Sequence, residues 1–186
     1  ELLLELFLKQ IIEWRQFQTD FNPGNFLFQN GKLAILDAGS FINLPSSYSN
    51  SLQALISADS SILSPDTAEQ IFLGFDFDLD KLIHIKEYLP ELIKIINEPF
   101  KNPEPVSLKD WHIKEKIDLL LGEKKWWFRS AGSPTFFHLL RSFSLLIRFL
   151  GGLNVPISFD KVTKSLNLTS SNFVIKNHSN LQSQHR

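Results

Sequence analysis

The sequence contains no cysteine and no methionine, and it carries almost no excess of charge. Without cysteine the chain has no disulfide and no cysteine-ligated zinc site, although this alone does not fix the compartment. The 19 basic and 20 acidic residues leave a formal net charge of −1. The charge therefore gives no reason to expect a nucleic acid or an anionic membrane surface as partner.

Long apolar runs are also missing. The most apolar stretch, residues 136–150, carries His138, Arg141 and Arg148. It is also shorter than the roughly 20 residues that a membrane-spanning helix needs. We therefore expect no transmembrane segment, and no secretory signal is visible. Because there is no methionine and Glu1 already lies inside an expected helix, we expect a fragment of a longer protein. We separately expect that protein to be intracellular.

The sequence does contain enough apolar residues, 43% of 186, to build one domain with a core. Helices are predicted over residues 2–14, 48–56, 65–74, 78–97, 107–121 and 134–150. Ser64-Pro65 and Ser133-Pro134 are typical helix starts, and Gly151-Gly152 is a typical stop. We expect a domain over residues 1–156 and a polar, weakly ordered tail over residues 157–186.

One segment lacks helical spacing and reads QTDFNPGNFLFQNGKLAILDAG. At its centre Asn30-Gly31 lies between two apolar runs, which is the strongest short-range signal for a two-residue hairpin. This turn places Gln29 opposite Lys32, and the pairing steps outward by one residue on each strand. We therefore expect Asn25 and Asp37 to meet at the open end of the hairpin.

Three polar side chains of this segment make chemical sense together. Asn25 and Asp37 offer the oxygen ligands that Mg²⁺ prefers, and Mg²⁺ needs only one or two protein ligands beside water and phosphate. Asp20, five residues before Asn25, is then free to orient or accept the proton of an attacking hydroxyl. The alternative is that these residues only form turns by bonding nearby backbone groups. The hairpin and the strand-end Asp-x-Gly favour a phosphoryl-transfer site.

Other side chains are weaker candidates. The run Trp126-Trp127-Phe128-Arg129 has the composition of a membrane-interface or ligand-stacking patch, but core packing between helices is the favoured interpretation. His84, His112 and His138 are scattered without the spacing of metal ligands.

The chemistry-bearing residues also carry a family resemblance. The motifs FLKQ at residues 7–10, QTDFNPGNFL at 18–27 and LAILDAG at 33–39 resemble the UbiB or aarF family of atypical protein-kinase-like proteins. That family has a (Q/H)-(T/A)-D-P-(N/H)-x-x-N catalytic loop and a D-F-G metal motif. The resemblance covers about residues 1–153. It implies an α+β, mainly α fold: the C-terminal lobe of a protein-kinase-like domain, with one β-hairpin carrying the catalytic and metal corner.

The resemblance further implies roles and partners. Asp20 is the expected catalytic-loop aspartate, and Asn25 and Asp37 are expected to hold Mg²⁺ on the phosphates of ATP or ADP. The implied function is that of an atypical kinase or ATPase that supports isoprenoid-quinone (ubiquinone) biosynthesis, peripheral to a membrane, with lipid or quinone-biosynthesis proteins as further partners. Two residues depart from the family: Phe21 replaces a proline, and Ala38 replaces the phenylalanine of D-F-G, which removes a packing contact of the metal loop.

The family's nucleotide-covering N-terminal lobe, with its lysine, its alanine-rich loop and its lysine-x-glycine-glutamine segment, is expected upstream of Glu1. We therefore expect the chain alone to hold half of a nucleotide site and to be inactive. Two alternatives stay open. One is a non-catalytic pseudokinase or truncated helical binding module, motivated by Ala38. The other is a small-molecule phosphotransferase, which Gln18 and the Leu-Asp-x-Gly strand make weaker.

Overall fold

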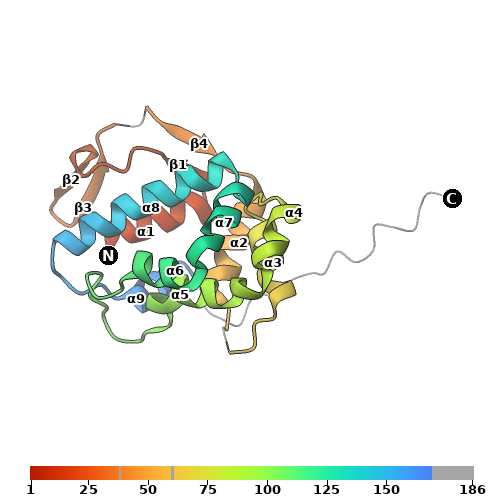
Figure 1. Cartoon of the computed structure of the whole chain (residues 1–186). Helices are drawn as coiled ribbons and strands as arrows, with labels where there is room; N and C mark the ends of the chain where they lie inside the picture. The colour runs from red at the N-terminus through yellow and green to blue at the C-terminus, as the bar shows by residue number, and fades with distance from the viewer. Residues whose placement is uncertain (38, 60, 169–186) are drawn as a thin grey trace.

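The computed structural model describes residues 1–37, 39–59 and 61–168, and helices dominate it (Figure 1). In chain order the elements are α1 (Leu2–Ile12), β1 (Gln16–Gln18), a 3₁₀ turn (Pro23–Asn25), β2 (Phe26–Gln29), β3 (Lys32–Ile35), β4 (Phe41–Asn43), α2 (Ser46–Ser57), α3 (Pro65–Leu73), α4 (Leu79–Leu82), a 3₁₀ helix (Ile83–Tyr88), α5 (Leu89–Lys101), α6 (Ile113–Leu121), a 3₁₀ turn (Gly122–Lys124), α7 (Lys125–Ala131), α8 (Pro134–Gly152) and α9 (Phe159–Ser165). The predicted α+β, mainly α class is confirmed. Within the described ranges, every helix is too short or too polar to cross a membrane.

The predicted hairpin is present with the predicted register. Strands β2 and β3 pair antiparallel from Gln29–Lys32 at the turn to Phe26–Ile35. Both turn residues are left-handed, with φ of 51° at Asn30 and 72° at Gly31. Because a two-residue turn of this hand matches the twist of the two strands, the Asn-Gly pair alone was enough to fix the pairing.

A second two-stranded sheet was not predicted. Strand β1 pairs antiparallel with β4, with Phe17 opposite Ile42, and Thr19 N donates to Ser40 O at 2.9 Å. Three-residue strands are too short for an alternating pattern to stand out in the sequence. The pairing brings together the two ends of the segment that holds the hairpin. Strands β1 and β4 thus close the base of one long loop that contains the hairpin (Figure 1).

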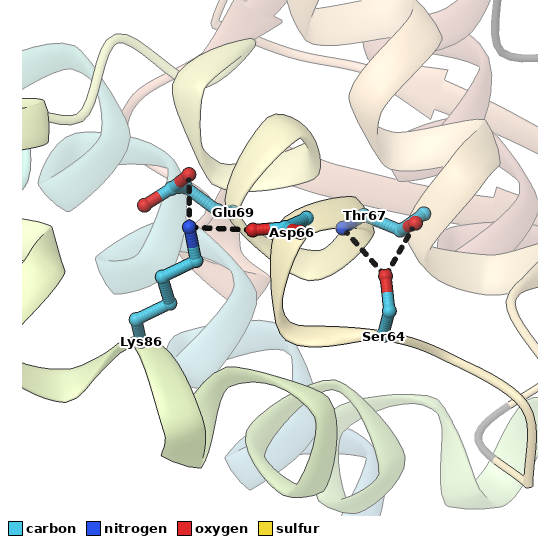
Figure 2. A network of polar contacts seen from close by, with 5 residues as sticks. All are labelled: Ser64, Asp66, Thr67, Glu69 and Lys86. Carbon is cyan, nitrogen blue, oxygen red and sulfur yellow. Dashed lines mark hydrogen bonds and ion pairs between the residues drawn. The ribbon is translucent and has the colours of Figure 1, made fainter.

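The helix starts carry the predicted caps. Ser64 Oγ accepts a hydrogen bond from Thr67 N at 3.1 Å and so caps α3. Figure 2 shows this cap beside an ion-pair network in which Lys86 Nζ lies 2.6 Å from Asp66 and 2.9 Å from Glu69. The hydrogen bonds to these two carboxylates raise the pKa of Lys86. The network ties α3 to the 3₁₀ helix that leads into α5.

Helix α6 begins later than predicted, at Ile113 rather than near residue 107. Trp111 is buried, at 3% exposed, and its Nε1 donates to Ile95 O on α5 at 3.1 Å. The next residue, His112, is left-handed with φ of 48°, which is incompatible with a continuous helix. Anchoring the indole on α5 therefore outweighs the helical preference of the preceding residues.

The predicted tail begins inside the packed structure. Phe159 of α9 is fully buried, and its ring packs edge-on against Phe100 of α5 at 4.9 Å. Helix α9 also contacts α1. The boundary predicted at residue 156 therefore falls within the packed part, and residues 157–168 belong with the domain. Residues 169–186 lie outside the described part of the chain.

The run of aromatic residues near α7 divides between core and surface. Phe128 packs against Phe77 with ring centroids 5.1 Å apart, and Trp127 stacks on His84 at 3.8 Å. Trp126 is 67% exposed. The core interpretation of this run therefore describes Phe128 and Trp127, while Trp126 lies on the surface.

Candidate functional site

The structure brings Asp20 and Asn25 together. Asn25 Nδ2 donates to the backbone carbonyl of Asp20 at 3.1 Å and to its Oδ2 at 3.2 Å. The 3₁₀ turn between them makes this contact, because it folds the chain back and is capped by Asn22 Oδ1, which accepts from Gly24 N at 3.1 Å. Asp20 is exposed and Asn25 is half-buried, so both are open to a ligand.

Asp37 lies just after β3, at the same open end of the hairpin, with its side chain turned to its own loop. Its Oδ1 accepts a hydrogen bond from Gly39 N at 2.8 Å. The ladder between the strands continues outward to Leu36 N and Asn25 O, which are 2.8 Å apart. In the described part of the chain, no hydrogen bond joins the side chains of Asn25 and Asp37.

A buried pair of glutamines holds these loops in place, and the sequence analysis gave neither a role. Gln10 Oε1 accepts from the backbone N–H of Gln18 at 2.9 Å, and Gln18 Nε2 donates to the backbone carbonyl of Asp37 at 2.7 Å. The two residues are 0% and 1% exposed. The sequence does indicate a buried role for Gln10, because it is a polar residue three positions after Phe7 on the apolar face of α1.

Each glutamine keeps one buried polar atom without a partner in the described structure. These atoms are Gln10 Nε2, a donor, and Gln18 Oε1, an acceptor. A leftover donor and a leftover acceptor in one buried pair suit an ordered water. The other atom of each amide is bonded to a backbone group, so the pair is a structural group.

Phe21 and Ser142 hold the loop from its other sides. Phe21 is 2% exposed and packs edge-on against Phe7 of α1, with ring centroids 5.5 Å apart. Ser142 Oγ of α8 donates to the carbonyl of Thr19 at 3.0 Å. Phe21, which departs from the proline of the family motif, therefore anchors the Asp20 loop on α1.

The donor atoms at this corner suit a hard cation that completes its shell from solvent and substrate. Asn25 and Asp37 offer amide and carboxylate oxygens, as Mg²⁺ requires, and Mg²⁺ usually takes only one or two protein ligands. In the described ranges, no cluster of three or more His, Cys, Asp or Glu side chains able to hold a metal occurs. Ala38 lies outside the described residues, so the effect of an alanine at the D-F-G position stays a prediction.

Residues 1–69 match the family model of the ABC1 atypical kinase-like domain. The matched segment includes α1, the hairpin and all three predicted site residues. No curated protein matches the sequence at a significant level. The resemblance to the UbiB or aarF family is therefore confirmed by the match over this segment, which contains the whole corner described above.

Proposed function

We propose that the corner formed by Asp20, Asn25 and Asp37 is the catalytic and metal-binding part of a Mg²⁺-nucleotide site in an atypical kinase or ATPase. The observation that carries the proposal is the pair of hydrogen bonds from Asn25 Nδ2 to Asp20, made on a loop that Gln18 and Ser142 hold. These supports fix the position of the loop, as a preorganised catalytic pair requires. The match to a kinase-like domain over residues 1–69 supports the same interpretation.

The roles follow from which atoms are already used. Because Asn25 Nδ2 is bonded to Asp20, its Oδ1 is the atom left for a cation. Asp37 offers Oδ2, since Oδ1 accepts from Gly39. Mg²⁺, when bound, neutralises charge on the nucleotide phosphates. Asp20, whose carboxylate is exposed and oriented by Asn25, is the proton acceptor for an attacking hydroxyl.

The cellular role that we propose is support of isoprenoid-quinone (ubiquinone) biosynthesis at the periphery of a membrane, with lipid or quinone-biosynthesis proteins as partners. It rests on the family resemblance of the sequence motifs. The hydrogen-bonded corner supports the proposed chemistry of the site and does not identify the physiological substrate.

The experiment measures the thermal shift of the full-length protein, including the expected N-terminal lobe, with ADP or ATP, with and without Mg²⁺. We expect a Mg²⁺-dependent rise of the Tm, lost in Asp37→Asn. Asp59→Asn is the matched control, because Asp59 Oδ1 accepts from Ser61 N at 3.0 Å in the same kind of turn outside the hairpin. A nucleotide shift that ignores Mg²⁺, or that is equal in Asp37→Asn and the control, would contradict the proposal.

One observation favours a second candidate, a non-catalytic pseudokinase or helical binding module. Asp37 Oδ1 is bonded to Gly39 N, and a side chain committed to its own loop binds a cation less readily. This candidate predicts a stably folded full-length protein with no Mg²⁺-dependent nucleotide shift, either unsubstituted or as Asp37→Asn. The same experiment therefore separates the two functions.

A further inference from the structure

A pocket of about 110 Å³, partly open to solvent, lies among the helices. Seven helices, α1, α2, α3, α5, α6, α7 and α8, contribute to its wall, and every residue of the wall is apolar. Phe7, Phe75 and Leu139 are buried members of the wall. None of Asp20, Asn25 and Asp37 lines it.

Water does not fill such a space favourably. A buried water needs two to four polar partners, and this wall offers none. Protein interiors otherwise pack with few voids larger than a water molecule, so the side chains that line this one forgo dispersion contacts on their inner side. A neutral apolar molecule would restore these contacts without leaving a polar group unpaired.

The size and the access of the cavity limit the ligand. An apolar cavity of about 150 Å³ holds benzene in another protein, so this one suits a molecule of about that size or slightly smaller. Leu140 of α8, the helix that runs across the front of Figure 1, is the most exposed residue of the wall. Leu140 of α8 is 36% exposed, and Ile113 and Ile117 of α6 are half-buried.

We infer that this cavity is a binding site for a small neutral apolar ligand, namely a hydrocarbon group of the size of a benzene ring or of the end of a short alkyl chain. A hydroxyl or a charge on the buried part of the ligand is rejected, because it would lose its hydration and find no partner. The inference does not rest on the nucleotide site, because Asp20, Asn25 and Asp37 take no part in it and the ligand has the opposite chemistry.

The test uses benzene as probe and phenol as its polar counterpart. We expect benzene to raise the Tm of the 186-residue chain in a saturable way, and phenol at equal concentration to give no saturable rise. Leu140→Trp should reduce the benzene shift at least twofold. Leu145→Trp is the matched control, because Leu145 lies on the same helix with the same 36% exposure but does not line the cavity. Ile117→Phe and Leu119→Phe repeat the comparison on α6.

A linear, non-saturable effect of benzene would overturn the inference, and so would equal shifts in the lining variants and their controls. A second measurement needs no variant and stands if a lining variant does not fold. Crystals of the unsubstituted chain under xenon should show density bounded by Phe7, Phe75 and Leu139. Absence of density there, or density only at other places, would equally overturn the inference.

Discussion

Gln18 donates a hydrogen bond of 2.7 Å from its side-chain amide to the backbone carbonyl of Asp37, across 19 positions of the sequence. The bond joins the strand that leads to Asp20 with Asp37, two residues after the end of β3. Because the backbone N–H of Gln18 is itself bonded to Gln10 on α1 at 2.9 Å, both loops are positioned relative to that helix. A buried neutral amide, rather than a salt bridge, thus sets the relative placement of the two carboxylates.

The importance of this amide can be measured with Gln18→Leu. The variant leaves the carbonyl of Asp37 without its buried donor, so we expect the free energy of unfolding to fall by about 1–3 kcal/mol. Gln16→Leu is the matched control on the same strand, since its hydrogen bond to Asn43 at 2.8 Å is exposed, and it should change stability by at most about 0.5 kcal/mol. Urea denaturation measures both, and equal losses would contradict the prediction.

The bond between α8 and the Asp20 loop gives a second matched pair. Ser142 is fully buried and donates to Thr19, whereas Ser144 is exposed and donates at 2.7 Å to Leu140 of its own helix. We expect Ser142→Ala to cost about 1–2 kcal/mol and Ser144→Ala less than about 0.5 kcal/mol. Hydrogen exchange should quicken at residues 19–25 in Ser142→Ala only. Unchanged exchange there would show that the bond does not restrain the loop.

The contact between Asn25 and Asp20 predicts how Asn25→Asp behaves. The variant replaces a donor 3.2 Å from Asp20 Oδ2 by an oxygen, which sets two carboxylates side by side. We expect a loss of about 1 kcal/mol relative to the unsubstituted protein at neutral pH. Acid should reduce this difference, because one carboxyl of the pair then takes up a proton.

Mg²⁺ at neutral pH should reduce the same difference, because a divalent cation offsets the repulsion between the two carboxylates. Asn22→Asp is the control, since a carboxylate still accepts from Gly24 N. Urea denaturation as a function of pH and Mg²⁺ makes the comparison. A difference independent of both pH and Mg²⁺ would argue against a close pair of carboxylates.

Alkaline pH should weaken the fold through Tyr48. Burial raises the pKa of this phenol from its ordinary value of 10 to about 12. A pKa that is higher in the folded state leaves stability unchanged below pH 10 and lowers it as the pH rises from 10 to 12, because only the unfolded chain then releases the proton easily. The expected loss from this group is about 2 kcal/mol at the upper end.

Tyr48→Phe isolates this contribution. At neutral pH the variant should be less stable by about 1 kcal/mol, because the hydroxyl lies 2.9 Å from Ser133 Oγ and donates to Phe75 O at 3.1 Å. Between pH 10 and 12 its disadvantage should shrink and then reverse, since it has no proton to lose at this position. Parallel stability curves for the two proteins would contradict the prediction.

The features that were predictable from the sequence are those that local chemistry decides. The hairpin needs two left-handed turn residues, and Asn30-Gly31 supplies them with little strain. Ser64 and Ser133 cap their helices because each precedes a proline that suits the first helical position. The proximity of Asp20 and Asn25 likewise follows from a short loop.

The features that the sequence did not reveal are those that distant residues decide. Strands β1 and β4 have only three residues each. They pair because the loop between them closes on itself, so that its two ends lie side by side. The position of Asp37 relative to Asp20 depends on Gln10, on a helix that carries no catalytic motif. Helix α6 starts late because Trp111 finds its partner on α5.

The hydrogen bond from Ser142 to Thr19 also has a consequence for folding during synthesis. Its two residues are 123 positions apart, and the ribosome adds about 5–20 residues per second, so about 6–25 s separate their synthesis. During that interval the nascent Asp20 loop has α1 beside it and lacks α8. The corner can therefore reach its final geometry only after α8 has been synthesised.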